Sequence, residues 1–215
     1  MKLLLLTFLG GLCLVTACQR GAGQVGSVNS KLVQVHALVE NADKLYQSQQ
    51  YASAIRHYDL ALVLNPGNAT AWGSRGNAKF KIKDLAGALA DYDQAIRLDA
   101  NFADAYYNRA TARFDAADYA EAVADYCATL RLSSERTDAL YNRGAAYYKL
   151  GNFKEALIDF DRVIDIEPDF ATVYNYRSKV KYALGNPPGA LADYQTSLRL
   201  LNLHAPSLAE RIGKL

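Results

Sequence analysis

The residues that could do chemistry on a substrate are few and scattered in this chain of 215 residues. The histidines are His36, His57 and His204, and none has the spacing to another ligand that a metal site needs. Asp91 and Asp93 lie two residues apart, so on a helix they point to different faces and do not form an acid and base pair. No phosphate-binding loop or nucleophile motif occurs. We therefore expect no enzyme activity, no metal and no cofactor.

A second set of charged residues recurs at fixed spacing. Arginine returns every 34 residues, and an aspartate follows each of these arginines 16 residues later. The pairs are Arg75 and Asp91, Arg109 and Asp125, Arg143 and Asp159, and Arg177 and Asp193. One period earlier, Asn41 and His57 occupy the two positions, so the charges appear and vanish together. This correlation predicts structural ion pairs between helices of one repeat or of adjacent repeats, in preference to a row of arginines that binds ligand carboxylates.

The same period of 34 residues runs without a gap from Val35 to His204. The five copies are 35–68, 69–102, 103–136, 137–170 and 171–204, and each is numbered here from position 1 to position 34. Position 20 is always alanine, position 8 is always small, and position 24 is always aromatic. Apolar residues recur in each copy at three- and four-residue spacing in two runs, which indicates two amphipathic helices. Such a period predicts a solenoid in which each repeat packs on its neighbours.

The first helices carry motifs that resemble the tetratricopeptide repeat family over about four-fifths of the chain. The motifs are Trp72-Gly73-Ser74-Arg75-Gly76, Tyr107-Asn108-Arg109-Ala110 and Tyr141-Asn142-Arg143-Gly144. The resemblance implies an all-α fold, a right-handed superhelical α-solenoid of five helix-turn-helix repeats with a concave groove. Residues 205–215 begin with a capping-box spacing from Ser207 to Glu210, which predicts a short C-terminal capping helix over the last repeat.

The first residues of the chain have the features of a secretion signal. Lys2 precedes an apolar run that ends at Leu14, which is shorter than the roughly 20 residues of a spanning helix. Val15-Thr16-Ala17-Cys18 resembles a bacterial lipobox, and this implies cleavage after residue 17 and lipidation of Cys18. We expect residues 1–17 to be a lipoprotein signal peptide and residues 18–34 a flexible tether. The alternative is an ordinary signal peptide in which Cys18 is incidental.

One side of each first helix is the candidate binding surface. Positions 2, 5, 9 and 12 lie on this side by helical geometry, and by resemblance it lines the concave groove. Aromatic rings and amide side chains suit the capture of an extended or helical peptide. The candidate partner-binding residues are Tyr46, Asn77, Phe80, Tyr107, Asn108, Phe114, Tyr141, Asn142, Tyr148, Asn175 and Tyr182. The rings at position 12 are equally open to a second interpretation, in which they only pack within the array.

The composition limits the classes of partner. Lys plus Arg is 24 and Asp plus Glu is 22, so no basic stripe points to nucleic acid. The leading hypothesis is a lipid-anchored scaffold or adaptor in the bacterial cell envelope, on the outer membrane facing the periplasm, because Gln19 replaces the aspartate of inner-membrane lipoproteins. It would bind a protein or peptide in its concave groove. The alternatives are a peptidoglycan-binding or other glycan-binding envelope module, and a cytosolic assembly factor whose start has been misread. The sequence identifies neither the partner nor the oligomeric state.

Overall fold

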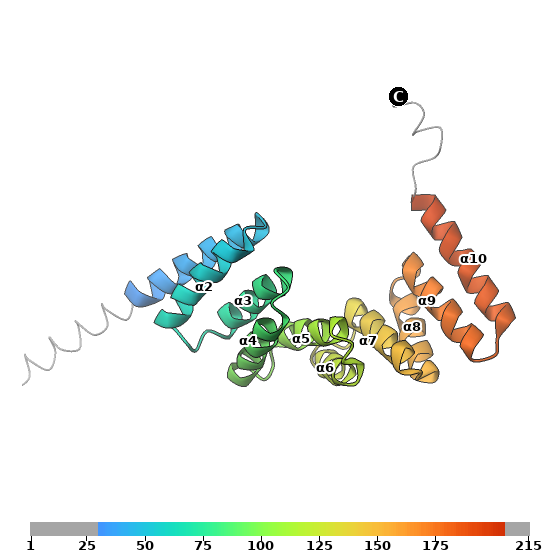
Figure 1. Cartoon of the computed structure of the whole chain (residues 1–215). Coiled ribbons are helices and arrows are strands. Elements are labelled where there is room, and N and C mark those ends of the chain that lie inside the picture. Colours follow the sequence, from blue (N-terminus) through green and yellow to red (C-terminus); the bar gives the residue numbers. More distant parts are fainter. Residues whose placement is uncertain (1–29, 205–215) are drawn as a thin grey trace, which may run out of the picture.

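A computed structural model of the protein describes residues 30–204, and within this range every regular element is a helix (Figure 1). The first helix covers residues 30–47. The others are α2 (Tyr51–Leu64), α3 (Ala69–Lys81), α4 (Leu85–Leu98), α5 (Ala103–Asp115), α6 (Tyr119–Leu132), α7 (Thr137–Leu150), α8 (Phe153–Ile166), α9 (Ala171–Ala183) and α10 (Pro187–His204). These consecutive helix pairs confirm the all-α solenoid class. The predicted signal peptide and capping helix lie outside the described residues.

The first helix includes residues 30–34, which the sequence analysis assigned to the tether. Val35 is only 5% exposed, so the chain is already packed on the array at this point. The preceding Leu32 and Val33 are 55% and 66% exposed. A helix that is anchored by its later turns extends through these residues because each further residue adds a hydrogen bond to a nucleus that has already formed.

The helix pairs follow one another along an arc (Figure 1). Each helix from α2 to α10 packs on its neighbours in the chain, and α3 also contacts α5, α5 contacts α7 and α7 contacts α9. Among these described helices the second helices of successive repeats do not contact each other. The first helices are therefore closer together than the second helices, which places them on the inner side of the arc.

A small residue at position 8 sets the distance between the two helices of a repeat. A Cβ atom on Gly76 would lie 2.7 Å from a ring carbon of Tyr92, and one on Gly144 would lie 2.8 Å from a ring carbon of Phe160. Both rings are at most 1% exposed. Close packing at native density leaves no room for a larger side chain here.

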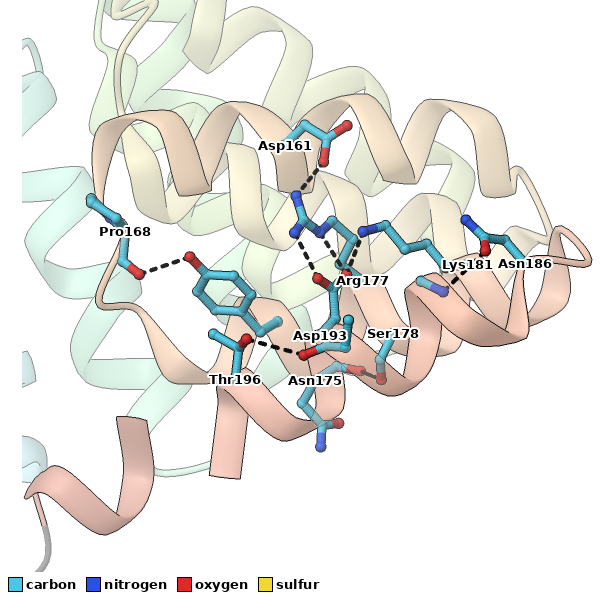
Figure 2. A network of polar contacts seen from close by, with 12 residues as sticks. Asp161, Pro168, Asn175, Arg177, Ser178, Lys181, Asn186, Asp193 and Thr196 are labelled. Carbon is cyan, nitrogen blue, oxygen red and sulfur yellow. Dashed lines mark hydrogen bonds and ion pairs between the residues drawn. The ribbon is translucent and has the colours of Figure 1, made fainter. Parts of the chain in front are cut away.

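The arginine at position 7 lies between two repeats. In the fifth repeat, Nε and Nη2 of Arg177 donate hydrogen bonds of 2.7 Å to the carboxylate of Asp193, while Nη1 donates at 2.6 Å to Asp161 of the preceding repeat (Figure 2). The same geometry joins Arg75 to Asp91 and Asp59, and Arg109 to Asp125 and Asp93. We call these contacts the arginine ladder.

Each ladder arginine and the residues that it contacts form one rung. Where a rung has two carboxylates, the two differ in burial. The Asp193 side chain is 7% exposed, whereas that of Asp161 is 49% exposed. An ion pair that water reaches contributes between about 0 and 1 kcal/mol, but removal of one partner from a buried pair costs about 3 to 5 kcal/mol. Loss of one partner is therefore more costly in the contact within the repeat than in the contact to the preceding repeat.

A second cation reaches the buried aspartate in three of the four rungs. It comes from position 11, where Lys79 lies 2.9 Å from Asp91 and Lys181 lies 2.8 Å from Asp193. In the third repeat Arg113 takes this role and lies 2.7 Å from Asp125.

The rung of Arg143, at the junction of repeats three and four, departs from this pattern at two positions at once. Cys127 replaces the aspartate of the preceding repeat, and Nη1 of Arg143 donates to its Sγ at 3.3 Å. Tyr147 replaces the second cation at position 11. One acid and one base are missing from the same rung, so the local charge balance is unchanged. Arg143 still donates two hydrogen bonds to Asp159, at 2.6 and 2.9 Å.

The pKa values of two buried aspartates, Asp159 and Asp193, are shifted in opposite directions. Burial raises the pKa of Asp159 above its ordinary value, against the opposing effect of Arg143. Burial acts in the same direction on Asp193, but hydrogen bonds from Arg177 and Lys181 outweigh it and the pKa of Asp193 is lowered. Arg143 alone therefore does not offset the effect of burial on the pKa of Asp159, whereas Arg177 and Lys181 together do so on that of Asp193.

A double-mutant cycle tests the buried pair. We expect Arg143→Met and Asp159→Leu each to lower the free energy of unfolding by about 3 to 5 kcal/mol, because each leaves an unpaired charge in the core. The double variant should lose less than the sum. Urea denaturation of the four proteins measures the coupling. The exposed pair Arg162 and Glu135, 3.5 Å apart, is the control and should show a coupling below about 1 kcal/mol. Additive losses for Arg143 and Asp159 would contradict the pairing.

The substitution Tyr147→Lys tests the role of the second cation. It should lower the pKa of Asp159, measured by NMR of the carboxyl carbon, whereas Tyr147→Phe should leave it raised. A carboxyl whose folded-state pKa is lowered stabilises the native state above its unfolded pKa and loses that contribution as the pH falls through the folded value. The lysine variant should therefore be more stable than the phenylalanine variant at pH 7, and the difference should shrink as the pH falls through the two folded-state pKa values. A pKa of Asp159 equal in both variants would refute this role.

Candidate functional site

The inner surface of the array is formed by residues 30–47, α3, α5, α7 and α9. These are the first helices of the five repeats, and the candidate partner-binding residues all lie on them. Stacking of the repeats brings equivalent positions of neighbouring first helices together along one side.

Four of the five rings at position 12 pack against position 17 of their own repeat. The ring centroids of Phe114 and Tyr119 are 5.2 Å apart, and those of Tyr148 and Phe153 are 5.9 Å apart. Tyr46 lies 5.3 Å from Tyr51 in the same way, and Phe80 packs in the cluster that contains Leu85. All four are half-buried. They support the turn between two helices and present only part of each ring to the inner surface.

Tyr182 is the exception at position 12. Its side chain is 71% exposed, and position 17 of the fifth repeat is Pro187, which has no aromatic ring. The ring is free to bind a partner without loss of packing.

Tyr107 is held on three sides. The guanidinium of Arg136 lies 4.1 Å from the ring centroid, the ring of Tyr126 lies 5.9 Å away, and the hydroxyl accepts a hydrogen bond of 3.0 Å from Asn142. Arg136 is itself fixed by ion pairs to Asp104 and Asp138. Burial raises the pKa of Tyr107. The structure thus places Tyr107, half-buried, in the joint between repeats three and four.

Tyr141 is packed among rings. Its centroid lies 5.1 Å from that of Phe170, 5.5 Å from that of Tyr176 and 6.2 Å from that of Phe160. Burial raises the pKa of Tyr141 as well. The two tyrosines at position 5 therefore contribute to the stacking of repeats as well as to the inner surface.

The four candidate asparagines divide into two groups. Asn77 accepts a hydrogen bond of 2.8 Å from the hydroxyl of Tyr92, and Asn142 donates to Tyr107. The side chains of Asn108 and Asn175 make no hydrogen bond with the rest of residues 30–204. These two amides are available to a partner on the inner surface.

A polar pocket of about 170 Å³ opens at the junction of repeats one and two. Asp43, Tyr46, Gln47, Tyr58, Ser74 and Asn77 line it. The hydroxyl of Tyr58 donates a hydrogen bond of 2.5 Å to Oδ1 of Asp43. Burial and the neighbouring Asp43 raise the pKa of Tyr58, so this hydroxyl keeps its proton and remains a donor. Asp43, Gln47 and Ser74 were not predicted from the sequence, although Asp43 occupies position 9, on the candidate binding side of its helix.

The described residues contain no cluster of three or more side chains that could hold a metal ion. Among the same residues no helix is both long and apolar enough to cross a membrane.

Comparison with protein families gives the class of the protein. A model described as "Tetratricopeptide repeat" matches residues 137–170, the range predicted for the fourth repeat, and one described as "TPR repeat" matches residues 76–116. Together with the stacked helix pairs, these matches show that the chain belongs to the tetratricopeptide repeat (TPR) family. No curated protein is significantly similar to the chain in sequence.

Solved structures share the fold. A crystal structure of MamA is 23% identical with a TM-score of 0.71, over 75% of this chain and 94% of that one. MamA from Desulfovibrio magneticus RS-1 is 13% identical with a TM-score of 0.76, over 80% of this chain and 98% of that one. YrrB, described as a TPR protein with an unusual peptide-binding site, is 21% identical with a TM-score of 0.73, over 89% of this chain and 97% of that one.

Alanine substitutions separate rings that stabilise the array from rings that are free. Tyr107→Ala should lower the free energy of unfolding by about 2 to 3 kcal/mol, because it removes a half-buried ring and the acceptor of Asn142. Tyr182→Ala should change it by less than about 0.5 kcal/mol, since the ring is exposed. Urea denaturation measures both. Equal losses would contradict the distinction between the two rings.

Proposed function

We propose that the protein is a lipid-anchored scaffold of the bacterial cell envelope that binds another protein or a peptide on its inner surface. The observation that carries the binding role is the continuous row of first helices. It presents an exposed ring at Tyr182, a polar pocket beside Asp43, and the amides of Asn108 and Asn175, which make no hydrogen bond within residues 30–204. A TPR protein of similar fold, YrrB, is described as having a peptide-binding site, which supports the same role here.

The packing of the rings favours a protein partner over a glycan. Sugars are held by open aromatic faces, whereas Tyr46, Phe114 and Tyr148 each pack on another ring of their own repeat. Hydrogen-bonding side chains along an extended surface suit the backbone and side chains of a peptide. A peptidoglycan-binding module remains the second candidate through the open ring of Tyr182.

The anchor is proposed from the sequence Val15-Thr16-Ala17-Cys18. Lipidation of Cys18 with more than one acyl chain would give stable attachment, since each buried methylene contributes about 0.8 kcal/mol. The first described helix begins at residue 30. The distance between Cys18 and residue 30 is therefore at most about 40 Å, the length of a fully extended chain of this many residues. The inner surface would then act within a short distance of the membrane.

Labelling with a palmitate analogue tests the anchor. Cells that express the full chain should incorporate the label into the protein and retain it in the outer-membrane fraction. Cys18→Ala should abolish the label, and Cys127→Ala, which keeps the lipobox intact, should retain it. Absence of label from the full chain would refute lipid anchoring.

Binding to purified sacculi separates the two candidate partners. We expect retention of the protein to be lost when proteins are stripped from the sacculi by protease. Retention on stripped sacculi that Tyr182→Ala abolishes would replace the protein partner by a glycan.

A further inference from the structure

We propose that the polar pocket between repeats one and two holds a basic side chain, arginine or lysine, of the peptide or protein that lies on the inner surface. This inference rests on the proposed function and specifies the chemistry of the partner at one point. Its evidence is the charge, the hydrogen-bonding groups and the volume of the pocket.

The carboxylate of Asp43 has no cation partner within residues 30–204. Its one hydrogen bond comes from the hydroxyl of Tyr58. The nearest basic residue in sequence, Lys44, is paired with Glu40 at 2.6 Å, and Arg75 of the next repeat is paired with Asp59 and Asp91. An ionised carboxylate accepts about four hydrogen bonds, so most of its capacity is unused.

The absence of a cation beside Asp43 follows from the sequence of the first repeat. Position 7 is Asn41, where the other four repeats have the ladder arginine, and position 11 is Leu45, where three of them have lysine or arginine. Position 9 carries an acid only in this repeat, since the equivalent residues are Asn77, Thr111, Ala145 and Lys179. Among the five first helices, only that of the first repeat therefore has an acid at position 9, and this acid has no basic residue at position 7 or position 11 of its own repeat.

The lining of the pocket suits a group rich in donors. Besides Asp43, the acceptors are the side-chain oxygens of Gln47, Ser74 and Asn77, and none of the lining residues is basic. The side chain of Tyr46 also lines the pocket. A carboxylate ligand would meet the charge of Asp43 with no compensating cation, and is disfavoured.

The size of the pocket fits the end of such a side chain. Its volume of about 170 Å³ is close to that of a cavity of about 150 Å³ that holds benzene. A planar guanidinium with its adjacent methylenes is of comparable size. The pocket opens on the inner surface, so the rest of the partner can continue along α3 and α5.

An NMR titration tests this inference without the natural partner. Spectra of the ¹⁵N-labelled protein are recorded with increasing N-acetyl-L-arginine amide, and with N-acetyl-L-glutamic acid amide as the comparison ligand. We expect saturable shifts of the amides of Ser74 and Asn77 with the arginine compound alone. Asp43→Asn, which keeps the shape of the side chain, should weaken this binding at least about tenfold, because the charge-assisted hydrogen bonds are lost.

The matched control is Asp59→Asn, which removes a half-exposed carboxylate of the same repeat that faces Arg75. It should bind the arginine compound as the unaltered protein does. The inference is overturned if the arginine compound causes no saturable shifts, if Asp43→Asn binds it equally well, or if the glutamate compound binds as tightly. None of these results bears on the anchor or on the sacculus experiment, so failure of this inference is distinct from failure of the proposed function.

Discussion

A buried carboxylate in the second helix of repeats two to five is the constraint on which the rest of the array depends. The side chains of Asp91, Asp125, Asp159 and Asp193 are between 3% and 7% exposed. Such a group has to keep a cation at hydrogen-bond distance, and the arginine of the first helix supplies it. The same arginine points its third donor at the preceding repeat. One side chain thus fixes both the pairing of two helices and the orientation of neighbouring repeats.

The places where this pattern is incomplete differ in consequence. At the junction of repeats three and four, Cys127 and Tyr147 remove an acid and a base together, so the rung of Arg143 stays neutral and structural. In the first repeat the arginine and its buried aspartate are both absent, and an acid appears instead at Asp43 on the inner surface. That acid is not needed to hold the helices together and is available to a ligand.

The fold and the charge pairs could be anticipated because they repeat. The period of 34 residues predicts the helix pairs, and the joint appearance of arginine at position 7 and aspartate at position 23 points to their contact. The packing of Tyr107 under Arg136 could not be predicted in this way, because it does not follow the repeat. Position 34 is phenylalanine in the second and fourth repeats, at Phe102 and Phe170, but it is Arg136 in the third. The pocket was missed for the same reason: Asp43 departs from its repeat, and its importance comes from its surroundings in three dimensions.

Amide hydrogen exchange of two aspartate variants tests the central constraint most directly. Asp125→Asn leaves Arg109 and Arg113 facing a buried neutral group, while Asp93→Asn alters the exposed carboxylate on the other side of the same arginine. We expect Asp125→Asn to lower protection throughout α5 and α6, and Asp93→Asn to change it little. Equal losses in the two variants, or a larger loss in Asp93→Asn, would show that the buried carboxylate does not govern the packing of the repeats.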